Sequence, residues 1–422
     1  MTSSLRNKKA NPRIPLLFKG DTLRFPLLFK EGLGVVLILL LTACRGGQTT
    51  SVQAVGDTIA FKYATQLTVV RYDGYTVVTL KNPWKDGKTL HQYVLVPAAN
   101  SPLEQCSLAT NGTQELSTLH SQLPNATFIR TPLRRSMIFS TVHCAMLMDL
   151  GKQDCIAGVA DLKYIKIPWI QQQVKEGRIS DVGDGLSPVV EKIIDQRPDA
   201  LFLSPFENSG GYGKLEDIDI PIVECAEYME SSPLGRAEWL RFYGMLFGCE
   251  QKADSLFDAI DKNYNDLKAL AAHHPSPNIQ HPSPTVLLDN VTGSVWYVPG
   301  GKSTIGQMIQ DAGGSYPWAG DTHSGSVSLP FESVLEKAGE ADVWLFRYSS
   351  DHDITYDELR SEHHGYNQFK AFREKNVYGC NVELSPFYEE TPFRPDWLLN
   401  DFIRILHPEL DSLPPLRYYK KL

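Results

Sequence analysis

Two glutamates occupy matching places in a pattern that the chain carries twice. The first copy spans residues 187–203 with Glu191 near its start, and the second spans residues 328–346 with Glu332 at the same place. Each copy predicts a helix capped by its opening serine, a glutamate in the first turn, an aspartate after the helix and a buried strand. A carboxylate in a first helical turn interacts favourably with the helix dipole, so two ordinary α/β units would already account for the pair. The repeat itself predicts two similar lobes.

Patterns that would support catalysis are weak. The chain has no Gly-x-Ser-x-Gly elbow, and residues 300–304 end like a phosphate-binding loop but have Trp296 where that loop needs its first glycine. No paired carboxylates fall in a segment that we expect to border a cleft. We therefore expect a protein that is not an enzyme, with no catalytic residue and no cofactor of its own. A metallocofactor or tetrapyrrole enzyme of the chelatase type is the alternative.

The histidines do not predict a site for a bare metal ion. Such a site needs three or four converging His and carboxylate ligands. Only His143 and His323 fall in segments expected at the cleft, and they belong to different lobes. The paired histidines at 273–274 and 363–364 are typical of loops or surfaces.

Composition and charge indicate a globular protein without a nucleic-acid partner. The chain has 422 residues, of which 42% are hydrophobic, so it can bury two cores. A net charge of −8 does not indicate the basic surface that nucleic-acid binding requires. Six cysteines follow Cys44 without the close spacing of a zinc site, and their spacing selects no disulfide pairing.

The beginning of the chain indicates export and lipidation. Residues 33–41 form an apolar run of nine residues, which is too short to span a bilayer. The segment closes with Ala43 and Cys44. This resembles a bacterial lipobox, which implies cleavage before Cys44 and a lipid on its thiol. The polar, glycine-containing residues 45–51 are typical of a tether. A buried hydrophobic helix that happens to end in Ala-Cys is the alternative.

The region before the lipobox is longer than a normal signal segment. Residues 13–19 and 24–30 are a near-exact tandem copy, which suggests a misassigned start. No Met lies between Met1 and Met137, so a shorter product would need a non-AUG start codon.

The mature chain begins with strand-like alternation and then changes to a strand-helix pattern. Alternating apolar residues at 67–72, 75–80 and 91–96, separated by Asp-Gly turns, predict an antiparallel meander. From residue 134 the pattern predicts a parallel, doubly wound lobe. Residues 234–272 carry apolar positions at helical spacing, interrupted only at Gly248, before the strand-helix pattern resumes.

The predicted fold class is α/β, with two doubly wound lobes joined by a single long helix and a small N-terminal antiparallel β meander. The predicted parts are a lipoprotein signal segment at 1–43, a tether at 44–58, the meander and its lead-in at 59–133, an N-terminal α/β lobe at 134–232, a connecting helix at 233–275 and a C-terminal α/β lobe at 284–422.

Four segments, in this order behind a lipobox, resemble the helix-linked class of substrate-binding proteins of ABC importers, the group that binds iron-siderophores, haem and vitamin B12. They are residues 183–199, 246–256, 300–314 and 393–402. The resemblance covers about residues 134–410 and leaves the meander without an assigned role. It implies a periplasmic, lipid-anchored monomer, on either membrane, that hands its ligand to an iron/B12-type permease with its ATPase.

The resemblance gives the two glutamates a second role. In that family one surface glutamate on each lobe meets arginines of the permease, and Glu191 and Glu332 fall on the matching positions. An arginine can hold a carboxylate through two hydrogen bonds, and two such contacts would fix the register of docking.

The ligand would lie between the lobes, outside the carboxyl ends of the parallel strands. The segments expected there are rich in aromatic residues, which suits haem, a corrinoid or a metal-siderophore chelate. The cleft candidates are Tyr164, Phe206, Tyr212, Tyr228, Trp296, Tyr297, Trp318 and Arg394, the last as a partner for ligand carboxylates. Core packing is the competing interpretation for each single aromatic, and a surface-exposed binding lipoprotein without a transporter is the competing interpretation of the whole chain.

Overall fold

The described part of the chain begins with a sheet that precedes the two lobes. The computed structural model describes residues 56–98, 119–207, 211–273 and 283–422. The signal segment, Cys44, most of the tether and Cys106 lie outside these residues. The first sheet has the order β1-β2-β3-β4-β5. Its strands are β1 (Asp57–Ile59), β2 (Leu67–Tyr72), β3 (Tyr75–Lys81), β4 (Thr89–Pro97) and β5 (Thr127–Thr131).

The first four strands form the antiparallel meander that the alternation predicts. Gly74 has a φ of 82°, which a tight β2–β3 turn requires and a residue with a Cβ rarely adopts. Val69, Val78 and Tyr93 are fully buried on the inner face of the sheet. The fifth strand was not predicted, and it runs parallel to β4.

Two buried glutamates hold the β1–β2 connection, and we call this arrangement the glutamate clamp. Glu238 accepts hydrogen bonds from the backbone N–H groups of Lys62 at 2.8 Å, Tyr63 at 2.7 Å and Ala64 at 2.8 Å. Glu230 accepts N–H bonds from Thr65 and Gln66, each at 2.9 Å. Buried carboxylates need such donors to offset lost hydration, so the clamp ties the meander to the helices that follow the first lobe.

The Lys62–Tyr63 pair extends the same attachment to a second helix. Lys62 Nζ and the Tyr63 hydroxyl both donate to the Asp261 carboxylate, at 2.8 and 2.7 Å. The meander therefore contacts both the end of the first lobe and the long helix beyond it.

The first lobe contains a parallel sheet in the order β12-β11-β6-β7-β8. Its strands are β6 (Ser136–Ile138), β7 (Ile156–Val159), β8 (Ser180–Asp181), β11 (Ala200–Leu203) and β12 (Ile222–Glu224). The connecting helices are α3 (Thr141–Asp149), α4 (Pro168–Lys175) and α5 (Val190–Gln196). β11 is buried at every position, as its continuous apolar run predicts for a central parallel strand.

The predicted serine caps of the two repeated helices were wrong. Ser187 lies in β10 (Ser187–Pro188), which pairs with β9 (Gly183–Asp184), and Ser328 lies in β16 (Ser326–Leu329). The helices α5 and α10 (Phe331–Ala338) begin later, after the N-cap residues Val189 and Pro330, which make no side-chain cap hydrogen bond. In both copies the serine belongs to a strand and not to the helix, but the glutamate lies in the first turn of the helix as predicted.

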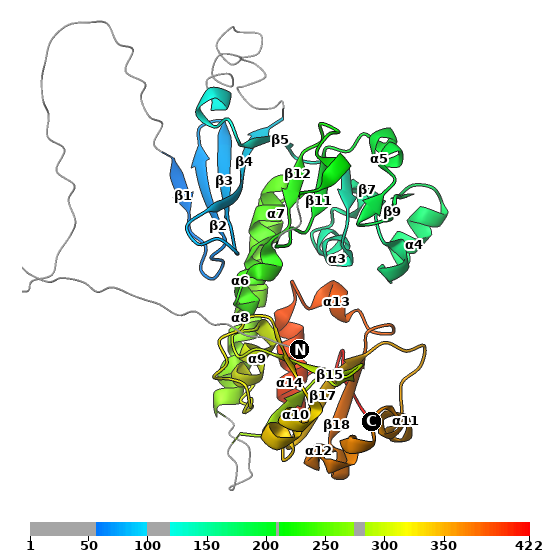
Figure 1. The fold of residues 1–422 in the computed structure, drawn as a ribbon. Coiled ribbons are helices and arrows are strands. Elements are labelled where there is room, and N and C mark those ends of the chain that lie inside the picture. The colour runs from blue at the N-terminus through cyan, green and yellow to red at the C-terminus, as the bar shows by residue number, and fades with distance from the viewer. Residues whose placement is uncertain (1–55, 99–118, 208–210, 274–282) are drawn as a thin grey trace, which may run out of the picture. The chain divides into compact units, whose positions relative to one another are not determined.

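Three helices in succession connect the lobes. They are α6 (Pro233–Glu238), α7 (Leu240–Phe247) and the 24-residue α8 (Glu250–His273). Gly248 ends α7 with a φ of 60°, a left-handed conformation that glycine adopts without strain. The apolar periodicity across this region therefore belongs to three shorter helices, of which α8 is the long connecting one (Figure 1).

The second lobe has two small sheets, in the orders β13-β17-β18-β19 and β14-β15-β16. Its remaining strands are β13 (Val286–Leu288), β14 (Val291–Thr292), β15 (Val295–Pro299), β17 (Val343–Tyr348), β18 (Val377–Asn381) and β19 (Lys420–Lys421). Its remaining helices are α9 (Thr304–Asp311), α11 (Tyr356–Glu362), α12 (Lys370–Arg373), α13 (Phe387–Glu390) and α14 (Pro395–Leu406).

The C-terminal segment is held by one buried carboxylate. Asp401 on α14 accepts backbone N–H bonds from Arg417 at 2.8 Å, Tyr418 at 2.7 Å and Tyr419 at 3.2 Å. This contact places β19 beside β18 at the edge of the sheet.

The described part of the chain contains no helix that is both long and apolar enough to cross a membrane.

Candidate functional site

The carboxyl edge of the first-lobe sheet borders a cavity of about 760 Å³, which we call the first-lobe pocket. Residues that follow β6, β7 and β11 line it, as expected where parallel strands end. They include Phe139, Asp161, Ser204, Phe206, Tyr212 and Glu191. Its size is in the range of small-molecule sites.

The pocket brings two predicted cleft residues together. Phe206 and Tyr212 both line it, and the Phe206 side chain is 53% exposed. The Tyr212 hydroxyl donates to Glu224 Oε2 at 2.9 Å, and burial, with the nearby Glu224 charge, raises the pKa of this hydroxyl. Burial also raises the pKa of Glu224. Tyr212 is thus fixed in orientation, whereas the Phe206 ring is free to stack on a flat ligand.

Aspartates in the left-handed conformation stand at strand ends in both lobes. Asp161 follows β7 with a φ of 52°, and Asp289 follows β13 with a φ of 59°. Residues other than glycine in this conformation are strained, and such strain often accompanies binding sites. Neither aspartate was among the site residues predicted from the sequence, although each follows an apolar run that predicts a strand.

Arg347 at the end of β17 holds Asp289. Its guanidinium donates to Asp289 Oδ1 at 3.0 Å and Oδ2 at 2.8 Å, and it lies 5.8 Å from the centre of the Phe387 ring. The Arg347 side chain is about one third exposed, but its charge is paired with Asp289, and the Phe387 ring beside it is buried.

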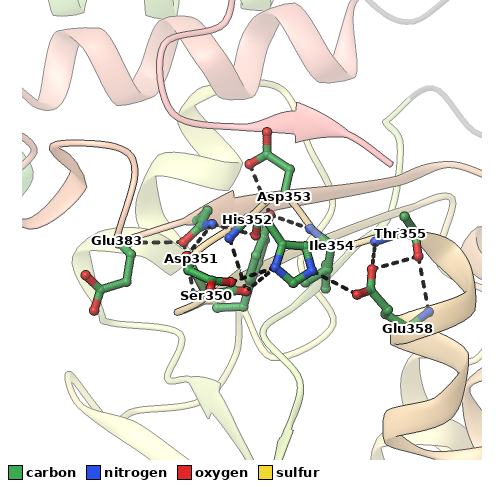
Figure 2. A network of polar contacts seen from close by, with 10 residues as sticks. Ser350, Asp351, His352, Asp353, Ile354, Thr355, Glu358 and Glu383 are labelled. Carbon is green, nitrogen blue, oxygen red and sulfur yellow. Dashed lines mark hydrogen bonds and ion pairs between the residues drawn. The ribbon is translucent and has the colours of Figure 1, made fainter.

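The loop after β17 is a dense polar network (Figure 2). His352 contacts Asp351 at 2.7 Å through Nδ1 and Glu358 at 2.8 Å through Nε2. Hydrogen bonds to Asp351 and Glu358 raise the pKa of His352 to about 9. The Asn381 side-chain amide donates to the carbonyl groups of Ser350 and His352, each at 2.9 Å, so the loop has a defined shape next to the end of β18.

The two lobes touch through α3 and the segment around α13. Lys166 pairs with Glu383 at 2.8 Å, and the Thr141 hydroxyl donates to the buried Glu389 at 3.2 Å. A cavity of about 420 Å³, the interlobe pocket, is lined from both lobes and has acidic walls at Asp149, Glu383, Glu389 and Glu390. Burial raises the pKa of Asp149 and of Glu389, as expected for carboxyl groups with incomplete pairing.

Several other predicted cleft aromatics are accessible. Tyr164 is 63% exposed beside Lys163, and Tyr297 on β15 is 45% exposed. Tyr228 is partly buried, its hydroxyl donates to the Pro205 carbonyl, and burial raises its pKa. Tyr388, which was not among the predicted residues, is 48% exposed on α13. These rings come from both lobes.

Three predicted cleft residues are engaged elsewhere in the fold, and the expectation for them was wrong. Trp296 is fully buried, donates to the Leu288 carbonyl at 2.9 Å and packs 5.8 Å from Trp344. Trp318 is 5% exposed. Arg394 forms two hydrogen bonds with Asp396, at 3.1 and 2.9 Å, and stacks 3.5 Å from the centre of the Trp397 ring. Because Arg394 already has an anionic partner, it does not present a free charge to a ligand.

Glu191 and Glu332 lie exposed in the first turns of α5 and α10. Among the described residues neither carboxylate forms an ion pair. Glu191 also lines the first-lobe pocket, a position that was not predicted for it. An exposed, unpaired carboxylate on each lobe is available to a partner.

The free cysteines do not form a disulfide framework within the described residues. Cys144, Cys225 and Cys380 are buried thiols, and Cys155 and Cys249 are partly buried thiols. Burial raises the pKa of all five.

Two α/β lobes with a helical connection and pockets at their strand ends define a solute-binding protein. The chain belongs to the periplasmic binding protein family, whose model matches residues 141–384. The meander before residue 98 lies outside this match.

Several known proteins are similar to this chain in sequence or in structure. An uncharacterised lipoprotein of Methanocaldococcus jannaschii is 28% identical over 295 residues, which cover 68% of each chain. A haem-binding protein of Pseudomonas aeruginosa has a similar structure, with a TM-score of 0.51, 18% identity and coverage of 67% of this chain and 95% of that chain. A molybdate-binding protein of Haemophilus influenzae matches with a TM-score of 0.52, 17% identity and coverage of 67% and 88%. At these identities the solved structures establish the fold.

Proposed function

We propose that this chain is a lipid-anchored substrate-binding protein that delivers an iron chelate, haem or cobalamin to an ABC importer. The observation that carries the proposal is the presence of exposed aromatic rings on both lobes, Tyr164, Phe206, Tyr297 and Tyr388. Flat or macrocyclic chelates bury exposed aromatic rings by stacking on them.

The charge around the proposed cleft favours a ligand with anionic groups on one side. Lys163 lies over the Tyr164 ring at 4.7 Å, and Arg347 lies near Phe387. Carboxylates of a tetrapyrrole or the negative charge of a ferric chelate would meet Lys163, because the charge of Arg347 is already paired with Asp289. The solved haem-binding relative supports this ligand class, whereas the molybdate-binding relative shows that the fold also accommodates a small oxyanion.

The ligand is identified by titration of the purified chain from Gln48 onward. Haemin, cobalamin and ferric siderophores should be added separately, with tryptophan fluorescence, ligand absorbance and melting temperature as measurements. A ligand that binds only the folded state raises the melting temperature by mass action. The Phe206→Ala and Tyr297→Ala variants should bind the same ligand at least tenfold more weakly, whereas Tyr75→Ala in the meander is the matched control. If none of these ligands changes any signal, the proposal fails.

Docking to the permease is proposed to use Glu191 and Glu332. Reversal of both charges, Glu191→Lys with Glu332→Lys, should abolish uptake, and Glu332→Lys alone, at the glutamate outside the first-lobe pocket, should leave ligand affinity unchanged. The matched controls are Asp195→Lys and Glu336→Lys, which make the same charge change at exposed positions of the same two helices. If ligand affinity falls together with uptake, the glutamates serve the cleft and not the permease.

The anchor is proposed to be a lipid on Cys44, which places the protein at a membrane facing the periplasm. The lipoprotein relatives support this part of the proposal. Cys44→Ser should move the protein from the membrane fraction to the soluble fraction after cell breakage. If the variant stays with the membrane, another segment provides the attachment.

A further inference from the structure

A buried group of metal-ligating side chains lies beneath the carboxyl edge of the first-lobe sheet, apart from the pockets described above. His143 is in the first turn of α3, Cys225 directly follows β12, and Glu227 comes two residues later. All three are at most 2% exposed. The potential ligand atoms of the imidazole, the thiol and the carboxylate all lie within 4.8 Å of one another.

We propose that His143 Nε2, Cys225 Sγ and the Glu227 carboxylate form a binding site for one divalent transition-metal ion of the zinc type. Imidazole, thiolate and carboxylate are the ligands that zinc uses in proteins, and the three elements that carry them converge without rearrangement of the sheet. This site is independent of the proposed transport function.

The spacing of the ligand atoms fits one ion. His143 Nε2 lies 3.4 Å from Glu227 Oε1, which is close to the separation of neighbouring ligands around a tetrahedral ion. His143 Nδ1 has no hydrogen-bond partner among the described residues. Without a metal ion, Nε2 faces the Glu227 carboxylate, and the unpartnered Nδ1 is available to take the proton when Nε2 binds the ion.

The groups behind the ligands are suited to hold them. The Tyr243 hydroxyl donates to Glu227 Oε2 at 2.9 Å and lies 3.3 Å from His143 Nε2. Arg236 lies 3.7 Å from Glu227 Oε1. Such contacts orient ligands around metal ions, and the Tyr243 oxygen is placed to complete the coordination or to support it.

A ring from the second lobe covers the group. Phe393 is 2% exposed, and its centre lies 6.3 Å from that of the His143 imidazole and 5.9 Å from that of the Tyr243 ring. Separation of the lobes would withdraw Phe393 and give the ion a route in. Metal binding would thus be coupled to the contact between α3 and the second lobe.

Binding must release one proton. Cys225 can bind an ion only as the thiolate, so its thiol must lose its proton. The metal–sulfur bond replaces the sulfur–hydrogen bond, the proton goes to solvent, and no oxidant or reductant is needed.

The test uses Co²⁺ and Zn²⁺ with the full chain, purified in detergent, reduced and stripped with a chelator. Each metal is supplied both by equilibration with the folded protein and during refolding, so that burial does not prevent access. We expect one Co²⁺ per chain with thiolate-to-cobalt absorption in the near ultraviolet, displaced by Zn²⁺, and a higher melting temperature with Zn²⁺.

The variants separate a metal site from a metal-free polar network. Cys225→Ser is nearly isosteric and should abolish the thiolate absorption, and Glu227→Gln should weaken Zn²⁺ binding at least tenfold. Cys144→Ser, at a buried thiol of α3 outside the group, should bind as the wild type does. Absence of the absorption after both loading routes, or its persistence in Cys225→Ser, would overturn the proposal.

Discussion

The glutamate clamp predicts a large and local effect of one isosteric substitution, Glu238→Gln. Glu238 is fully buried and accepts three backbone N–H bonds of 2.7–2.8 Å from residues 62–64. The amide oxygen of glutamine can keep the two bonds at one oxygen position, but its NH₂ group then faces the remaining N–H. A hydrogen bond to a charged group contributes roughly 1.5–3 kcal/mol, and the other two bonds lose their ionic character.

The expected loss is therefore about 2–4 kcal/mol, a large share of the roughly 5–15 kcal/mol that stabilises a typical domain. The assay is amide hydrogen exchange of the peptide that contains residues 62–66. Because about 1.4 kcal/mol corresponds to a tenfold change in an opening equilibrium, exchange there should accelerate by roughly 30-fold to 1,000-fold.

The control is Glu250→Gln. Glu250 pairs with Arg71 of the same meander, but both side chains are about half exposed. A surface ion pair of this kind contributes about 0–1 kcal/mol, so exchange at 62–66 should change by roughly fivefold or less. If Glu238→Gln leaves exchange within about threefold of wild type, the clamp does not hold the meander and the reasoning is refuted.

Three further outcomes are expected. Trp296→Ala should lower the free energy of unfolding, measured by urea titration, by about 3–5 kcal/mol, because it removes a buried ring. Tyr297→Ala should change the same free energy by less than about 0.5 kcal/mol, because its ring is exposed. Equal effects of the two substitutions would contradict the assigned side-chain orientations. His352 should titrate near pH 9 by NMR, against an ordinary value of 6.5, and Glu358→Gln should move the midpoint toward 6.5. Because the pKa of His352 is raised in the folded state, this residue stabilises the fold fully below about pH 6.5 and loses that contribution as the pH rises through about 9. An unshifted titration midpoint would contradict the contacts of His352 with Asp351 and Glu358. Asp401→Ala should make the C-terminal segment susceptible to carboxypeptidase, and unchanged resistance would show that β19 is held by other contacts.

Local sequence patterns were sufficient for the lobes and the meander. The alternation over residues 67–96 determines the β2–β4 hairpins, and Gly248 marks the end of α7 because only a left-handed residue fits there. β5 escaped prediction because its partner β4 lies across a long connection, and parallel pairing leaves no turn signal.

The aromatic candidates show which side-chain positions the local sequence pattern cannot predict. Trp296 and Tyr297 are neighbours on one strand, so their side chains point to opposite faces. The sequence establishes that one is inside and one outside but cannot say which, and the larger ring is the buried one. Arg394 was misjudged for a similar reason, because Asp396 and Trp397 take up its charge and its flat face only once α14 has formed.

Long-range polar contacts were not predictable at all. Glu230 and Glu238 look like ordinary helix surface residues in sequence, and their partners are backbone groups that carry no side-chain signature. The group of His143, Cys225 and Glu227 joins residues more than 80 positions apart, so the spacing rules for metal motifs do not detect it.

The glutamate clamp has a consequence for the order in which the chain folds. Its partners are separated by 164 to 176 positions in sequence, and the adjoining Lys62–Asp261 contact spans 199. A chain that emerges N-terminus first therefore exposes the inner face of the meander, with Val69, Val78 and Tyr93, until residues as far as Asp261 have followed. Contacts of such long range form late, and apolar sheet faces left uncovered meanwhile are prone to aggregate. The meander is thus the first part of the described fold to be made and among the last to dock, which makes it the segment where a chaperone would have most to protect.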